Sequence, residues 1–134
     1  MVEPVEGLSA VTIHVRDIQV ARRFYREVLG LHEAGFVEQT GRAVFTFPGN
    51  PTVLAMHVQR PDEGGREPGT VSGIIFEHHD PRAAVAEIRR RGGTIVRDPF
   101  EAPGPSGTIV RAVVSDPDGN EFVISTGHAA PPRA

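Results

Sequence analysis

The chain has 134 residues and a formal net charge of −3, a size that fits one domain. It contains no cysteine, which excludes a disulfide scaffold, a thiolate zinc site and a cysteine nucleophile. All 14 basic residues are arginine, so lysine Schiff-base chemistry is excluded, and the slightly acidic balance favours neither nucleic-acid nor membrane partners. No apolar run reaches the roughly 20 residues of a membrane span, and the acidic start lacks signal-peptide features. We therefore expect a soluble, cytoplasmic protein.

The first half predicts one strand, one helix and three further strands. Residues 10–17 alternate β-branched and polar side chains, which is typical of a strand with one face on a core. Asp17 is placed to cap the helix that follows, and Gly30 is placed to end it. Shorter strands, separated by glycine and proline, are expected at 31–38, 42–48 and 52–59.

The second half repeats this order after a connector at residues 60–70, which has no periodic apolar positions. A strand is expected over 71–79, and Asp80 with Pro81 then begins a second helix, which Gly92 ends. Three further strands are expected at 94–98, 107–115 and 121–126. A Pro/Gly-rich loop is expected at 99–107, and a terminal tail at 127–134.

The two halves align with one another. Asp17 and Asp80 differ by 63 positions, and so do Gly30 and Gly93, which indicates a duplicated unit. The sequence therefore predicts an α+β fold of two βαβββ modules, at about 8–59 and about 71–126, within one domain. Each module is expected to form a four-stranded sheet with its helix outside. The other sheet faces would surround a concave cup, where a ligand would bind.

Three segments have a recognisable order and spacing: Val11 to Asp17, Phe24 to Leu31 (Phe-Tyr-Arg-Glu-Val-Leu-Gly-Leu), and Asp-Pro-Asp-Gly-Asn at 116–120. With these segments the chain resembles the vicinal oxygen chelate superfamily, which includes glyoxalase I, bleomycin resistance proteins and extradiol dioxygenases. The resemblance implies the paired βαβββ fold. From the resistance proteins of that superfamily it also implies a homodimer with a ligand site between subunits.

The resemblance places the superfamily's metal ligands at positions that here lack donor atoms. The histidine seven residues before each helix-capping aspartate corresponds to Ala10 and Gly73. The glutamate four residues beyond the turn glycine corresponds to Val123 and, in the first half, to Val53 or Ala55. A divalent ion takes about four to six N or O ligands, so we expect neither a metal nor another cofactor.

A displaced set of polar residues is the alternative. By strand parity, four polar side chains could point into the cup: His14, His57, Glu77 and Glu121. Three of them would have to converge to hold a metal, whereas a single carboxylate in an apolar cup could act as a general acid or base. The candidate catalytic residues are Glu77 and Glu121, with His14 as a proton shuttle. Adjacent strand residues point to opposite faces, so His78 and His79 are not expected to share an ion.

The leading interpretation is a metal-free small-molecule-binding protein of the glyoxalase/bleomycin resistance type, used for drug sequestration or self-resistance. Its ligand would be flat and partly apolar, such as an aromatic natural product. One alternative is a lyase, isomerase or dioxygenase-like enzyme with a shifted metal site or a Glu/His acid–base pair. A second is a structural or accessory domain that binds no ligand. Ligand-binding residues are expected on the strands that line the cup: Ala10, Thr12, His14, Val53, Ala55, His57, Gly73, Ile75, Glu77, Arg111, Glu121 and Val123.

Overall fold

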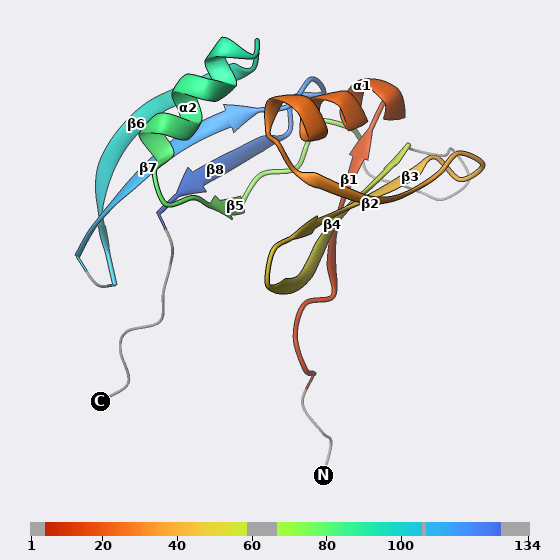
Figure 1. Cartoon of the computed structure of the whole chain (residues 1–134), viewed down its shortest axis with the longest axis horizontal. Helices are drawn as coiled ribbons and strands as arrows, with labels where there is room; N and C mark the ends of the chain where they lie inside the picture. Colours follow the sequence, from red (N-terminus) through yellow and green to blue (C-terminus); the bar gives the residue numbers. More distant parts are fainter. Residues whose placement is uncertain (1–4, 59–66, 106, 127–134) are drawn as a thin grey trace.

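The computed structural model of the chain describes residues 5–58, 67–105 and 107–126, which form two four-stranded sheets with a helical segment on each (Figure 1). The first module consists of β1 (Ala10–Val15), α1 (Ile18–Arg23), a π-helical turn η1 (Phe24–Val28), β2 (His32–Val37), β3 (Arg42–Phe47) and β4 (Asn50–Val58). The second consists of β5 (Ile74–Glu77), α2 (Pro81–Arg90), β6 (Thr94–Gly104), β7 (Gly107–Ser115) and β8 (Glu121–Ser125).

The strand orders of the two sheets are equivalent, which confirms the α+β fold of two βαβββ modules. The sheets have the orders β1-β4-β3-β2 and β5-β8-β7-β6. In each, the first strand pairs in parallel with the last, and the other neighbours are antiparallel. Residues 60–66 of the expected connector and the tail at 127–134 lie outside the described residues.

The helices begin where the capping residues predict. The Asp17 carboxylate accepts hydrogen bonds from the backbone N–H groups of Gln19 and Val20, at 2.9 and 3.2 Å. The Asp80 carboxylate accepts one from the Ala83 N–H at 3.2 Å, with proline following the cap. The duplicated caps therefore fix the start of both helices.

Two predicted strand boundaries are wrong. The strand expected over 71–79 covers only Ile74–Glu77. Conversely, β6 extends to Gly104 through the segment expected to be a loop at 99–107. β6 is an edge strand of its sheet, so Pro99 and Pro103 can lie in it without removing a hydrogen bond that an inner strand would need.

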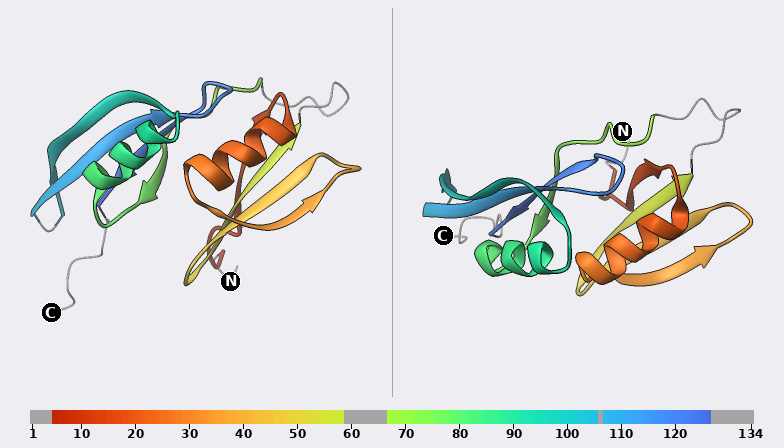
Figure 2. Two further views of the ribbon diagram at one scale, coloured as in Figure 1. Left: turned by 45° about the horizontal axis from the view of Figure 1, so that its top comes forward. Right: turned by 90° about the horizontal axis from the view of Figure 1, so that it is seen from above.

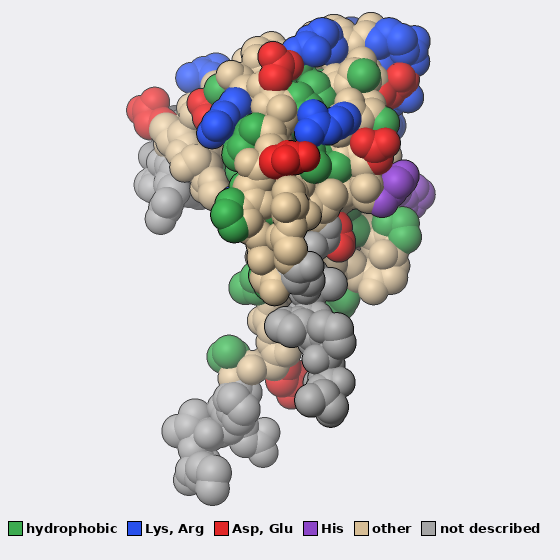
Figure 3. Space-filling model, turned by 90° about the vertical axis from the view of Figure 1, so that its left-hand side faces the viewer, with side chains coloured by type: hydrophobic (Ala, Val, Ile, Leu, Met, Phe, Trp, Pro, Cys, Tyr) green, Lys and Arg blue, Asp and Glu red, His purple; other side chains and the backbone are tan. Residues whose placement is uncertain are grey.

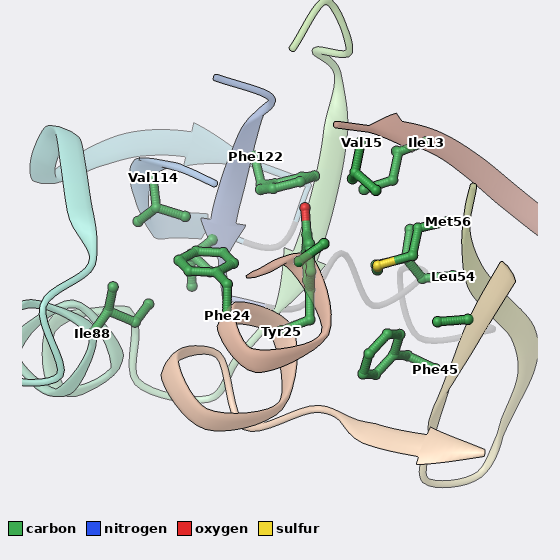
Figure 4. Close-up of a cluster of buried hydrophobic side chains, with 13 residues drawn as sticks. Ile13, Val15, Phe24, Tyr25, Phe45, Leu54, Met56, Ile88, Val114 and Phe122 are labelled. Carbon is green, nitrogen blue, oxygen red and sulfur yellow. The ribbon is translucent and has the colours of Figure 1, made fainter. Parts of the chain in front are cut away.

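The helical segment of the first module packs against both modules. The Tyr25 ring lies 5.9 Å from Phe45 of its own sheet and 5.8 Å from Phe122 of the other, between ring centroids (Figure 4). The sequence pattern predicts a helix on the outside of the molecule, but this helical segment also contacts the second module. It lies on the side of its sheet that faces the second module (Figure 2). One hydrophobic core thus joins the two halves.

A buried hydrogen bond completes this junction. The Tyr25 hydroxyl donates to Asp116 Oδ2 at 2.7 Å, and both side chains are buried. Asp116 Oδ1 accepts from the backbone N–H groups of Asp118 and Asn120, and Oδ2 also accepts from Asn120 Nδ2, each at 2.9 Å. Burial and the neighbouring carboxylate raise the pKa of Tyr25 well above its usual range, so the phenol remains a donor.

Tyr25→Phe should lower the free energy of unfolding by about 2 kcal/mol, because a hydrogen bond to a buried charged group is lost while the ring still packs. Urea unfolding followed by circular dichroism measures this change. Thr40→Ala is the control, since it removes an exposed hydroxyl that bonds the Val37 carbonyl. Equal stabilities of the two variants would show that the Tyr25 hydroxyl does not stabilise the junction.

Candidate functional site

A groove of about 1210 Å³ lies between the two modules, and we call it the intermodule groove. The first module lines it with the end of its helical segment, the β3–β4 hairpin and the start of β1. The second module lines it with β5 and with one face of α2. Most of the lining side chains are apolar, including Leu29, Phe47, Ile75 and Ile88. The volume is sufficient for an organic ligand of ordinary size.

Two aromatic rings form one wall of the intermodule groove. Phe47 on β3 and Phe76 on β5 have ring centroids 6.0 Å apart and are tilted by 40°. Aromatic faces of this kind can stack on a flat ligand. Phe76 is not among the residues predicted from the sequence to bind a ligand. The only signal for it is its position in a short apolar strand that packs against the core. Two other aromatic rings are covered by arginine side chains, since the Arg22 guanidinium lies over Phe36 and that of Arg97 lies over Phe100.

Charged side chains at the rim of the intermodule groove are held by one another. Hydrogen bonds from Arg90, and then from Arg91, lower the pKa of Glu87 to about 2. The Arg91 guanidinium also donates to the backbone carbonyl of Glu27 at 3.0 Å. Acidic and basic side chains are mixed over the outer face of this module (Figure 3). Glu87 therefore stays ionised at neutral pH and cannot serve as a general acid.

Four of the twelve expected ligand-binding residues line the intermodule groove: Val53, Gly73, Ile75 and Glu77. The other eight lie on strands outside that lining. We call the sheet face turned away from the helical segments the open face. The pairing of β1 with β4 places five of them on the open face of the first sheet: Ala10, Thr12, His14, Ala55 and His57. Arg111, Glu121 and Val123 lie on the corresponding face of the second sheet, on β7 and β8.

The residues at the superfamily's metal positions do not fit a metal ion. Ala10 pairs with Val53, and Val123 pairs with Ile75 and Val113, so these sites offer no donor side chains. Gly73 has a φ of +93°, a left-handed backbone conformation that side chains other than glycine rarely adopt. The local backbone, as well as the side chain, therefore differs from what a ligating histidine needs.

The displaced polar set does not come together either. The His14 and His57 rings lie side by side, with centroids 6.4 Å apart. Glu77 pairs with Ser125 at one end of β8 and Glu121 lies at the other end, about 13 Å away along the strand. Among the residues that the structure describes, no group of three or more His, Cys, Asp or Glu side chains could hold a metal ion.

The His78–His79 pair lies beyond the end of β5, so the rule of alternating strand faces does not apply to it. The two rings stack with centroids 4.6 Å apart, which corrects the expectation that they point in opposite directions. His78 Nδ1 accepts a hydrogen bond from the backbone N–H of Asp80 at 2.9 Å. His78 Nδ1 therefore binds the backbone of Asp80, the residue that caps α2.

The model of the Glyoxalase/Bleomycin resistance protein/Dioxygenase superfamily matches residues 7–124. The chain belongs to this superfamily. It is 28% identical to virulence protein STM3117 of Salmonella typhimurium over 125 residues, covering 90% of this chain and 84% of that protein. The crystal structure of STM3117 has a TM-score of 0.74, with 29% identity over 92% of this chain and 98% of the other.

Two further similarities lie within Streptomyces. The chain is 34% identical over 124 residues to the anthracycline biosynthesis protein DauV of Streptomyces sp. strain C5, which covers 88% of this chain but only 40% of that protein. TnmS3, an antibiotic binding protein from Streptomyces sp. CB03234, has a TM-score of 0.78 at 23% identity, covering 92% and 98% of the two chains. At this identity the likeness establishes the fold alone. Within residues 5–58, 67–105 and 107–126 of this superfamily member, no helix is long and apolar enough to cross a membrane.

Proposed function

We propose that this superfamily member binds a flat, partly apolar small molecule in the intermodule groove and does so without a metal ion. The observation that carries the proposal is the lining itself, in which apolar side chains of both modules adjoin the Phe47–Phe76 wall. Apolar walls with a few fixed polar groups at the rim are typical of small-molecule sites. The intermodule groove offers such groups in Glu87 and Arg91.

The names of two similar proteins suggest the chemical class of the ligand. DauV is named for the biosynthesis of anthracyclines, which are planar aromatic polyketides, and TnmS3 is named as an antibiotic binding protein. We therefore infer an aromatic natural product as the ligand, with sequestration or self-resistance as the use of binding. A cytoplasmic location agrees with that use.

The enzymatic alternative has less support from the geometry. Glu77 and Glu121 are both exposed, so neither carboxylate is enclosed by other side chains. The His14 ring is beside His57, on a different sheet from either carboxylate. A Glu/His acid–base pair is thus not assembled within the described chain.

A homodimer is the inferred state in solution. In the part of the chain that the structure describes, the helical segments lie on one face of each sheet, and the open faces carry no helix (Figure 2). β2 and β6 are edge strands of the two sheets. Each of these edge strands carries a large exposed apolar side chain, Val37 at 47% and Val96 at 49% exposure. Exposed edges with apolar side chains favour pairing with another chain.

Ile75→Glu should weaken binding of an anthracycline by roughly tenfold or more, since it places a charge in the apolar lining. Drug fluorescence during titration gives the dissociation constant. Val20→Glu is the matched control, because Val20 is a similarly exposed apolar residue on α1, outside the intermodule groove. Equal affinities of the two variants, or no binding by the wild type across anthracyclines, anthraquinones and naphthoquinones, would contradict the proposal.

Divalent Zn²⁺, Mn²⁺ or Ni²⁺ should leave the melting temperature unchanged within about 1 °C, because the family's ligand positions have no donor atoms. Elemental analysis of the purified protein should likewise give far less than one metal per chain. A stoichiometric ion that raises the melting temperature and is needed for ligand binding would contradict the metal-free proposal.

Analytical ultracentrifugation should give twice the chain mass of 14.4 kDa. The dimer should persist in high salt, because apolar contacts between the sheets are not screened by ions. A sedimenting mass equal to one chain at every protein concentration would contradict the inferred homodimer.

A further inference from the structure

Arg42 lies on the open face of the first sheet, next to two histidines on neighbouring strands. In the register of the sheet, Arg42 of β3 is opposite His57 of β4, and His57 is opposite His14 of β1. The Arg42 Nη1 atom donates a hydrogen bond to His57 Nε2 at 2.7 Å. Arg42 and both histidines are partly buried. The three side chains therefore form one continuous polar row across the sheet.

The hydrogen bond defines how charge is distributed in this row. Arginine can only donate, so His57 Nε2 must supply a lone pair and is not protonated in this arrangement. An imidazole nitrogen of this kind satisfies one N–H group but does not neutralise the guanidinium. Arginine has five N–H donors, and among the described residues the Arg42 guanidinium has only the His57 contact. The remaining donors can therefore bind a ligand.

Arg42 differs in this respect from six of the ten other arginines that the structure describes. No carboxylate among the described residues lies within ion-pair distance of its guanidinium. In contrast, six other arginines form ion pairs with Asp or Glu: Arg16, Arg22, Arg26, Arg89, Arg90 and Arg91. A partly buried guanidinium without a carboxylate partner attracts an anion more strongly than a fully solvated one does.

The next row of the open face consists of small, uncharged side chains. Val44 of β3 is partly buried, Ala55 of β4 is fully buried, and Thr12 of β1 is exposed. Neither row contains an acidic side chain. A molecule with an oxyanion at one end and a small apolar body could therefore place its charge on Arg42 and its body along Val44.

We propose that Arg42, together with His57 and His14, forms a binding site for a carboxylate group of a small organic acid. This site is separate from the intermodule groove. Val53 of β4 lines the groove and is four residues before His57, about 13 Å along the strand. The planar guanidinium fork matches the two oxygens of a carboxylate. The His14 ring, 6.4 Å from that of His57 between centroids, extends the same polar row. The proposal does not depend on what occupies the groove.

The test is an NMR titration of the full chain with benzoate, using the ring resonances of His14 and His57 and the Arg42 Nε resonance as readouts. Benzoate should shift all three in a saturable way, whereas the neutral isostere benzamide should not. Arg42→Gln should weaken benzoate binding by roughly tenfold or more, because a charge-assisted hydrogen bond is lost. Arg42→Lys, which keeps the charge but loses the fork, should fall between the two.

Arg23→Gln is the matched control, since Arg23 is exposed on α1 and its loss changes the net charge equally. Benzoate affinity should stay within about twofold of wild type in this variant. Equal weakening by Arg42→Gln and Arg23→Gln would overturn the site, and so would equal shifts with benzamide and benzoate. If Arg42→Gln does not fold, unchanged benzoate affinity in Arg42→Lys would overturn the role of the fork.

Inorganic phosphate and acetate distinguish the source of the anion. Saturable acetate shifts that Arg42→Gln abolishes would support carboxylate recognition without any contribution of the apolar body. Phosphate binding much tighter than that of benzoate would overturn the carboxylate assignment in favour of a phosphate-bearing ligand. Failure of anthracyclines to bind would contradict the proposed function of the groove and leave this result unaffected.

Discussion

The hydrogen bond between Tyr25 and Asp116 joins the helical segment of one module to the tight turn of the other, in a place closed to water. Asp116 also organises its own turn through Asn120, whose side-chain carbonyl accepts from the Val71 N–H at 3.0 Å. The Asp116 carboxylate thus stabilises its own turn, positions Asn120 to bind the chain before β5, and accepts a hydrogen bond from Tyr25 of the first module. Within the described residues no strand of one sheet pairs with a strand of the other, so the relative placement of the sheets depends on this hydrogen bond and on the shared hydrophobic core.

The intermodule groove follows from how the modules meet. Four aromatic rings form a chain from the sealed core outward, in the order Tyr25, Phe122, Phe76 and Phe47, with centroids 5.8, 5.1 and 6.0 Å apart. Tyr25 and Phe122 pack the two modules together in the core, and Phe76 and Phe47 line the groove. Since β5 is only four residues long and β3 turns back at Phe47, neither strand covers the space between them. The same packing therefore produces the core and the candidate site.

Local signals in the sequence predicted what depends on local chemistry. Asp17 and Asp80 marked both helix starts, and alternation placed His14 and His57 on one face of a sheet. The length of β6 could not be predicted, because Pro99 and Pro103 would normally end a strand. Proline is tolerated in an edge strand, and only the topology of the sheet shows that β6 is one. The lining of the groove depends on how the two modules pack, and the Arg42–His57 contact depends on the register of β3 against β4. The periodicity of a single strand predicts neither the packing nor the register.

Gly73 limits how a metal site could be built into this chain. Its backbone is left-handed at the position where the resemblance to the superfamily places a metal-ligating histidine, and a histidine there would cost on the order of 1 kcal/mol in strain. Two other positions that the resemblance implies, Ala10 and Val123, also lack donor atoms. Installing an ion would therefore require several substitutions at once, together with a local change of the backbone.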